Sequence, residues 1–213
     1  DKILNKAKEE LVWPTEISEK VIESIRQDWD KLNIRPDKTV KVTDSIYIIQ
    51  EMISKLLASK HAYKADNGDI LFDLSKSLAT PFSHARGEDA QDFALWKKQD
   101  SNDWGVPFTH GYGRPGWHIE CSAMIRRHLG ETIDIHGGGM DLKFPHHENE
   151  IHQSVAANGA PLATMFVHSG MVTVNGTKMS KSLGNHIVYK DLDYDPMVVR
   201  FDLLRTKYNQ VYD

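Results

Sequence analysis

The sequence predicts an α/β fold in which a parallel sheet is covered by helices. Between residues 117 and 168, helical and strand patterns alternate with short links, which favours parallel strands joined by helices. The chain has 213 residues, of which 40% are hydrophobic and 26% charged, as expected for one large or two small folded domains. Since no run approaches the roughly 18 apolar residues of a membrane span, we expect no membrane partner.

The first half of the chain reads as helices followed by a hairpin. Helices are expected over residues 2–10, from a cap at Thr15 to about residue 32, and from a cap at Thr43 or Asp44 to about residue 57. Asn67-Gly68 between apolar runs predicts a β-hairpin over residues 62–74. A short strand is expected at residues 93–96, and a functional or poorly ordered loop over residues 99–116, which are rich in Gly and Pro.

The second half supplies the expected parallel sheet. A helix is predicted over residues 117–129, a strand over 132–136, a tight turn at Gly137–Gly139, a helix over 145–157 and a strand over 165–168. Ligands of such sheets bind at the carboxyl ends of the strands, where the Gly-rich turn is expected to fall.

Cysteine content and charge narrow the class of protein. Cys121 is the single cysteine, so no intramolecular disulfide can form and a cytoplasmic enzyme is favoured over a secreted scaffold. The net charge of -4 argues against a stand-alone nucleic-acid binder but permits a local basic patch. The chain opens on Asp1-Lys2-Ile3 with neither Met nor a signal peptide. We therefore expect residue 1 to be a cut edge and not the natural N-terminus.

Three side chains are candidates for a metal site. Pro145 is expected in the first turn of a helix, and His146 and Glu150 are then four residues apart on one face of it. With Cys121 they offer nitrogen, oxygen and sulfur, a mixture that zinc accepts and magnesium does not. Three protein ligands with an open position indicate a reactive zinc site. The alternative is a surface His–Glu pair beside a small buried cysteine.

A zinc hydrolase is the second metal hypothesis to weigh. His147-Glu148 begins a His-Glu-x-x-His motif, but the required second histidine position holds Ile151 and His152 comes one residue late. Because this shift places His152 on a different helix face, a hydrolase of that type is disfavoured.

A pair of lysines is the candidate for phosphate binding. Lys178-Met179-Ser180-Lys181-Ser182 follows an expected hairpin over residues 171–174 and is flanked by Gly176 and Gly184. Two lysines and several hydroxyl and N–H donors on such a loop can neutralise a triphosphate. By composition alone it is a basic surface loop, but the five residues match the second signature of class I aminoacyl-tRNA synthetases in full.

Taken together, five segments make the chain resemble the cysteinyl-tRNA synthetases. The resemblance extends more loosely over residues 1–112 and so covers essentially the whole chain. The five segments are Gly113–Met124, Asp134–Gly139, Asp141–Glu150, His168–Val172 and Lys178–Asn185.

The resemblance implies a role for each candidate residue. Cys121, His146 and Glu150 match the zinc ligands, one zinc ion per chain being expected. Trp117 and Asp141 match residues that bind the cysteine substrate. Lys178 and Lys181 match the lysines of catalysis and ATP binding. His136, Gly138 and Gly139 match the ATP-binding turn near the adenylate.

The resemblance also implies a domain plan. It is a class I synthetase Rossmann-type parallel sheet with an inserted α+β connective domain. Residues 1–33 would end the first catalytic half, 34–112 would form the insertion, 113–190 the second catalytic half, and 191–213 the start of the stem-contact helical region. The family's second zinc cysteine, His-x-Gly-His motif and anticodon-binding domain have no counterpart in the chain. Departures are Met140, a short stretch over 78–88 and a short join over 190–195.

The implied activity is that of a cysteine–tRNA ligase. ATP, with Mg2+, and cysteine would give cysteinyl-adenylate and pyrophosphate, and the tRNA(Cys) 3′ end would then accept the cysteinyl group. Zinc would select cysteine over serine through its thiolate. The expected partners are therefore tRNA(Cys), cysteine and ATP, and we expect a monomer. Two alternatives stay open: a cysteine-adenylating ligase acting on an amino-sugar in mycothiol synthesis, and a non-catalytic fragment.

Overall fold

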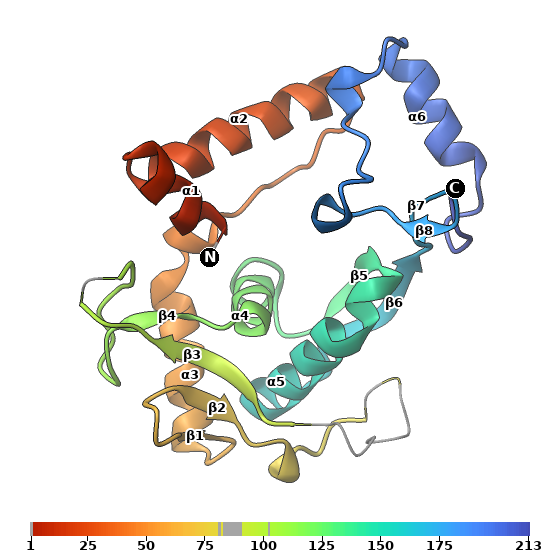
Figure 1. The fold of residues 1–213 in the computed structure, drawn as a ribbon. Helices are drawn as coiled ribbons and strands as arrows, with labels where there is room; N and C mark the ends of the chain where they lie inside the picture. The colour runs from red at the N-terminus through yellow and green to blue at the C-terminus, as the bar shows by residue number, and fades with distance from the viewer. Residues whose placement is uncertain (1, 81, 83–90, 102) are drawn as a thin grey trace. The chain divides into compact units, whose positions relative to one another are not determined.

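The computed structural model describes residues 2–80, 82, 91–101 and 103–213 (Figure 1). The chain divides into two compact units. One comprises residues 1–39 and 170–213, and the other comprises residues 40–169. Within the described residues, no helix is long and apolar enough to cross a membrane.

The unit of residues 40–169 begins with helix α3 and a small antiparallel sheet. Strands β1 to β4 follow one another in the order β1-β2-β3-β4, each antiparallel to the next. The hairpin predicted around Asn67-Gly68 is confirmed, whereas the loop predicted over 99–116 contains the additional strand β4, which pairs with β3. The bounds are α3 (Ile46–Ala58), β1 (Ala62–Lys64), β2 (Ile70–Phe72), β3 (Phe93–Lys98) and β4 (Gly113–Pro115).

The same unit continues as helix, strand, helix, strand. Its two strands, β5 and β6, are parallel, with Ile135 opposite Met165 and Gly138 opposite His168. Parallel pairing of consecutive strands requires the crossover that α5 supplies, so the predicted parallel sheet and mixed α/β class are confirmed. The bounds are α4 (Trp117–Leu129), β5 (Ile133–Gly139), α5 (Glu148–Asn158) and β6 (Ala163–Ser169).

Two sequence predictions in this region were wrong. Gly137–Gly139 is not a tight turn: the three glycines complete β5 and pair with residues of β6. The helix predicted from Pro145 begins as α5 at Glu148, after a turn over Lys143–His147 that is kinked at Phe144, whose backbone angles are extended. The spacing of apolar and polar residues identified both β5 and α5. Pairing with β6 decided where β5 ends, and the turn over Lys143–His147 decided where α5 begins.

An apolar core holds this unit together. Ile49, Ile53 and Leu56 from α3 are fully buried against the sheet residues Ile70 and Phe72. The core continues into α4 through Ile119 and Ala123 and into α5 through Ala157. These contacts fix α4 and α5 beside one another and so set the positions of the side chains on their facing sides.

The unit of residues 1–39 and 170–213 is built from helices and one small hairpin. Helix α2 begins at Pro14, not at the predicted Thr15 cap, and the Glu16 carboxylate accepts a hydrogen bond from the Trp13 N–H at 3.0 Å. Helix α3 in the other unit likewise begins after Ser45 and not at Thr43 or Asp44. The bounds are α1 (Lys2–Glu10), α2 (Pro14–Lys31), β7 (Thr173–Val174), β8 (Thr177–Lys178) and α6 (Pro196–Arg205).

Contacts between the ends of the chain close this unit. The Arg200 guanidinium of α6 donates to the carbonyls of Leu32 and Asn33, at 2.6 and 2.8 Å, where α2 ends. Near the hairpin, the Thr173 N–H donates to the Tyr212 carbonyl at 2.8 Å. The suspected shortening over 78–88 lies largely outside the described residues.

Candidate metal centre and phosphate-binding loop

Helix α4 positions Cys121. It starts directly after Gly116, whose backbone packs so closely on β3 that an added Cβ would lie 1.9 Å from the Ala94 carbonyl oxygen. Ile119 and Ala123 face the core. Cys121 lies on a different side of the helix, is partly buried and is not in a disulfide.

The other two candidate ligands come from the start of α5. His146, in the turn that precedes α5, is 4% exposed, and Glu150, in the first turn of α5, is 0% exposed. Their Nε2 and Oε1 atoms are 3.0 Å apart. The spacing of four residues therefore places both on one side, as predicted, although the helix starts later than predicted.

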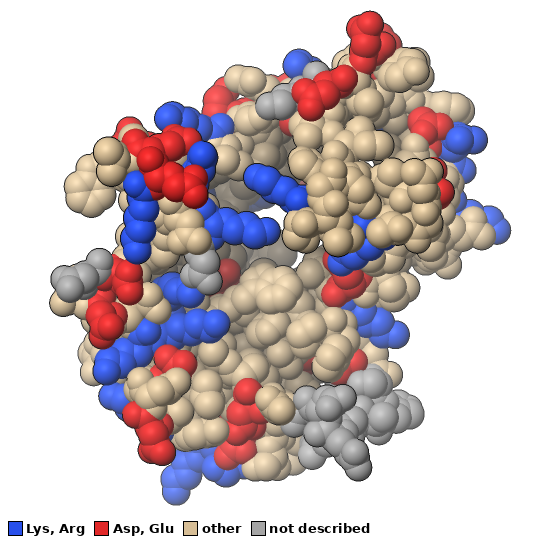
Figure 2. All heavy atoms as spheres, viewed as in Figure 1, with Lys and Arg blue, Asp and Glu red and all other residues tan. Residues whose placement is uncertain are grey.

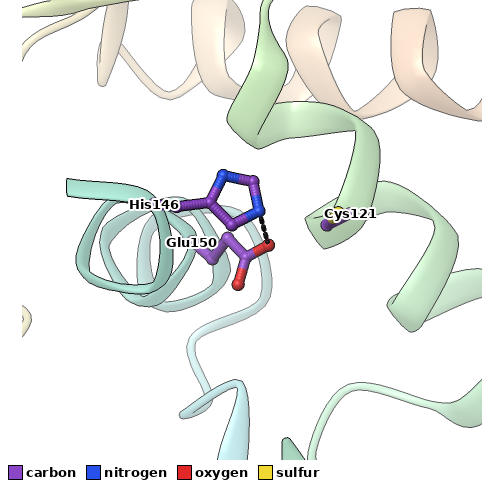
Figure 3. Close-up of side chains that lie close together, drawn as sticks. All are labelled: Cys121, His146 and Glu150. Carbon is purple, nitrogen blue, oxygen red and sulfur yellow. Dashed lines mark ion pairs between the residues drawn. The ribbon is translucent and has the colours of Figure 1, made fainter. Parts of the chain in front are cut away.

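The three predicted ligands converge. The donor atoms of Cys121, His146 and Glu150 all lie within 4.8 Å of one another. Figure 3 shows them reaching toward one another from α4 and from the α5 segment, with the ion-pair contact between His146 and Glu150 dashed. This is close enough for one ion to contact all three atoms.

The polar contacts fit a cation at this point. Glu150 Oε1 is buried, and none of the described residues gives it a hydrogen bond, because the 3.0 Å approach of His146 lacks hydrogen-bond geometry. An unpartnered buried carboxylate oxygen is costly. A sulfur, a nitrogen and this oxygen match the ligand preferences of zinc.

Further imidazoles surround these ligands. His118 and His146 approach through their Nδ1 atoms at 2.9 Å, and His136 Nε2 lies 2.7 Å from Glu150 Oε2. His147 Nδ1 lies 2.9 Å from His168 Nε2. Sequence reasoning did not anticipate these contacts of His118, His147 and His168; the high density of histidines between residues 110 and 152 was a signal for the first two.

Burial shifts the pKa values of the site. Burial, followed by the charge of Glu150, raises the pKa of the Cys121 thiol to about 12. Burial by itself would raise the pKa of Glu150, but its contacts with the imidazoles of His136 and His146 outweigh this effect and lower it to about 2. The carboxylate is thus ionised at neutral pH, whereas the thiol needs a nearby cation to lose its proton.

Of the two predicted substrate-binding residues, Trp117 contacts this group. The Trp117 ring is 56% exposed and stacks on His146, with ring centroids 4.4 Å apart. Asp141 follows the carboxyl end of β5 and is exposed. An added Cβ at Gly139 would lie 2.5 Å from the Asp141 Oδ1 atom, and one at Gly138 would lie 2.7 Å from the His147 ring. The two glycines therefore allow the side chains at this end of β5 to approach the backbone.

The predicted lysines lie in the other unit, on an exposed loop. Lys178 ends β8, and Lys181 opens a short 3₁₀ turn over Lys181–Leu183. Asn185 links the two sides of this loop: its Oδ1 accepts from the Ser180 N–H at 2.9 Å, and its Nδ2 donates to the Lys178 carbonyl at 3.1 Å. The loop therefore presents both lysines to solvent on a defined backbone.

Figure 2 shows Lys and Arg side chains interspersed with Asp and Glu over the visible face. Such mixing agrees with the net charge of -4. Charge alone therefore does not mark a nucleic-acid surface on this face.

Solved structures with the same fold are aminoacyl-tRNA synthetases. The Mycobacterium tuberculosis methionyl-tRNA synthetase in complex with methionyl-adenylate aligns over 99% of this chain and 56% of its own, with a TM-score of 0.71 and 16% sequence identity. The Plasmodium falciparum arginyl-tRNA synthetase aligns over 93% of this chain and 34% of its own, with a TM-score of 0.51 and 15% identity. The fold is thus that of the class I synthetases.

Sequence comparison then gives the particular family. The family profile described as "tRNA synthetases class I (C) catalytic domain" matches residues 1–213. The chain belongs to this family.

The curated relatives are longer proteins. The cysteine–tRNA ligases of Synechococcus sp. (strain CC9605) and Sulfurihydrogenibium sp. (strain YO3AOP1) are each 45% identical to the whole of this chain, which covers 48% and 47% of them respectively. That of Desulforamulus reducens is 44% identical over the whole chain, which covers 48% of it. The chain therefore spans about half the length of the curated relatives it matches.

Proposed function

We propose that this chain carries the catalytic chemistry of a cysteine–tRNA ligase. Two things support the proposal: membership of the synthetase family and similarity to curated cysteine–tRNA ligases. The single observation that supports cysteine as the substrate amino acid is the convergence of the donor atoms of Cys121, His146 and Glu150 within 4.8 Å. A group of this composition in a synthetase fold has an evident use in recognising a thiol.

Selection of cysteine over serine is the physical problem such an enzyme must solve. An apolar pocket discriminates between such similar side chains by only about 1–3 kcal/mol. Cys121, His146 and Glu150 would hold a zinc ion, which supplies a soft Lewis acid that prefers a thiolate to a neutral hydroxyl. Their burial excludes water from one side of this position.

Neighbouring residues would orient the amino acid. Asp141 carries a carboxylate at the carboxyl end of β5, the edge at which parallel sheets bind ligands. It would pair with the ammonium group of cysteine. Trp117 would form one wall of the pocket, since its exposed ring stacks on His146.

The nucleotide would contact two further elements. Lys178 and Lys181 would neutralise the triphosphate, together with Mg2+, and stabilise the pyrophosphate as it leaves. Gly138 and Gly139, at the end of β5, would adjoin the adenylate, because backbone without a side chain permits close approach. His136, two residues before Gly138 in the same strand, would lie near the adenylate as well. The terminal hydroxyl of tRNA(Cys) would then attack the carbonyl carbon of the adenylate, forming the cysteinyl ester and releasing AMP.

Isotope exchange between ATP and pyrophosphate tests this function. We expect exchange that depends on cysteine, with serine giving almost none. In the Cys121→Ser variant, zinc binding and cysteine-dependent exchange should both be lost. Exchange that persists unchanged in this variant would refute zinc-based selection.

The acceptor is tested separately. Radiolabelled cysteine should be transferred to tRNA(Cys) and not to an amino-sugar. Transfer to the sugar amine alone would instead assign the chain to the related amino-sugar ligases. Neither exchange nor transfer, with a folded and zinc-loaded chain, would favour a binding role without catalysis.

A further inference from the structure

The two nitrogen atoms of the His146 ring face different partners. Nε2 points to Glu150 Oε1 at 3.0 Å and belongs to the converging ligand group, while Nδ1 lies 2.9 Å from His118 Nδ1. A neutral imidazole has one N–H and one lone pair. If Nε2 offers its lone pair to an ion, Nδ1 must carry the N–H hydrogen and donate a hydrogen bond to His118.

The surroundings of His118 suit it to accept a hydrogen bond from the Nδ1–H of His146. Its side chain is buried, and the Phe93 ring meets it edge to face with centroids 5.5 Å apart. A neutral imidazole has one N–H and one lone pair, so the Nδ1 of His118 accepts this hydrogen bond when its own proton resides on Nε2.

The carboxylate of Glu150 is held in an equivalent way. Oε2 receives the 2.7 Å contact from His136 Nε2, whereas Oε1 is the oxygen to which none of the described residues gives a hydrogen bond. His136 is 14% exposed and Glu150 is fully buried. One oxygen is therefore fixed, and the other is left facing His146 and Cys121.

A second group of potential ligands, His136, His147 and Glu150, also converges within 4.8 Å. Two of its contacts have an explanation without an ion: His136 Nε2 and Glu150 Oε2 are at hydrogen-bond distance, and His147 Nδ1 is paired with His168. In this interpretation His136 and His147 surround the ligand group of Cys121, His146 and Glu150 and do not themselves bind an ion. The number of bound ions distinguishes the two interpretations.

We propose that His118 and His136 are positioning residues: His118 fixes the tautomer of His146, and His136 fixes the orientation of the Glu150 carboxylate, so that both ligands face Cys121. This inference rests on the proposed function insofar as that function requires zinc. Outer partners of metal ligands set both ring orientation and basicity, and their loss typically weakens metal binding about 10- to 100-fold.

Metal titration of the chain tests the proposal. Zn2+ affinity is measured by competition with a chelator, and Co2+ is used to follow the thiolate-to-metal absorption of Cys121. We expect His118→Ala and His136→Ala to weaken binding about 10- to 100-fold. His118→Asn, which keeps an acceptor near the Nδ1 position, and His136→Gln, which keeps a donor near Nε2, should recover most of the affinity. His128→Asn, an exposed change on the same helix, is the control and should have no effect.

Each outcome has a distinct meaning. A wild-type chain that binds no zinc refutes the zinc part of the proposed function. A wild-type chain that binds one zinc ion, with alanine variants of unchanged affinity, refutes the positioning role alone. Two ions per chain, one of which is lost in His136→Ala, would show that His136 is itself a ligand and would overturn its assignment as support.

A measurement on the wild-type chain covers the case in which the alanine variants do not fold. Long-range proton–nitrogen NMR spectra of the histidine rings identify the protonated nitrogen of each ring. We expect the zinc-loaded chain to show His146 protonated at Nδ1 and His118 at Nε2. His118 protonated at Nδ1 would overturn the assignment of its role.

Discussion

The two units of this chain hold their candidate chemical groups in opposite ways. In residues 40–169 the ligand group is surrounded by buried polar residues and rests on a continuous apolar core. In residues 1–39 and 170–213 the lysines are exposed, and among the described residues of this unit the buried apolar side chains are Ala7 and Ile17. A soft ion needs ligands fixed before it arrives, whereas a loop that meets phosphates must stay open to solvent.

The largest expected effect concerns the core itself. Phe72 is fully buried beneath α3, while Phe201 on α6 is 70% exposed. Phe72→Ala should lower the free energy of unfolding by about 3–5 kcal/mol, because it removes buried contacts and leaves a cavity. The matched Phe201→Ala should change it by less than about 0.5 kcal/mol. Chemical denaturation of both variants checks this, and equal losses would show that α6 is also part of a core.

Removal of a lysine should affect catalysis and leave the metal group intact. Lys181→Ala is expected to reduce ATP–pyrophosphate exchange by about 100- to 1,000-fold, the usual effect of removing one group that stabilises charge in the transition state. Zinc affinity should not change. Lys207→Ala, another exposed lysine of the same unit, is the control. A parallel loss of zinc would contradict the separation of the two roles.

Zinc should stabilise one unit more than the other. At a free zinc concentration about 100 times the dissociation constant, binding to the folded state alone adds about 2.7 kcal/mol. Hydrogen exchange should therefore slow in α4 and α5 and remain unchanged in α6. Cys121→Ser is expected to abolish this protection. Uniform protection along the whole chain would place the ion elsewhere.

Two neighbouring glycines offer a finer test of the packing around the ligands. An added Cβ at Gly138 would lie 2.7 Å from the His147 ring, whereas at Gly137 the nearest described atom would be the Val167 carbonyl oxygen at 4.0 Å. Gly138→Ala should cost about 1–3 kcal/mol by overpacking. Gly137→Ala should cost little. Thermal unfolding of the pair checks the difference, which vanishes if the His147 ring can turn away freely.

The smallest effect is expected at Asn185, whose side chain joins the two sides of the loop that carries Lys178 and Lys181 by two hydrogen bonds, here called the clip. Asn185→Ala removes the bonds to Ser180 and Lys178, each worth about 0.5–1.5 kcal/mol. The loop should become more sensitive to proteolysis, and the KM for ATP should rise. Asn185→Asp keeps the acceptor for the Ser180 N–H and should have an intermediate effect. Similar KM values in all three proteins would show that the clip does not order the loop.

Residues alone identified much of the site. The lone cysteine, the His146–Glu150 spacing and the lysine signature each have a local chemical meaning, and the structure brings the three predicted metal ligands together. The roles of the lysines, Trp117 and Asp141 stay predictions. His118 and His136 could not be assigned their contacts in advance, because these contacts join residues 28 and 14 positions apart.

The sequence by itself determined the class of fold, the order of its main helices and strands and the chemical types of the candidate ligands, since these follow from local periodicity and side-chain chemistry. The tertiary structure decided where β5 ends, that a turn kinked at Phe144 precedes α5, and which histidines contact which ligand. These features depend on pairing with β6 and on the packing of α4 against α5. Local periodicity of the sequence does not specify such contacts, because the residues that make them are far apart along the chain.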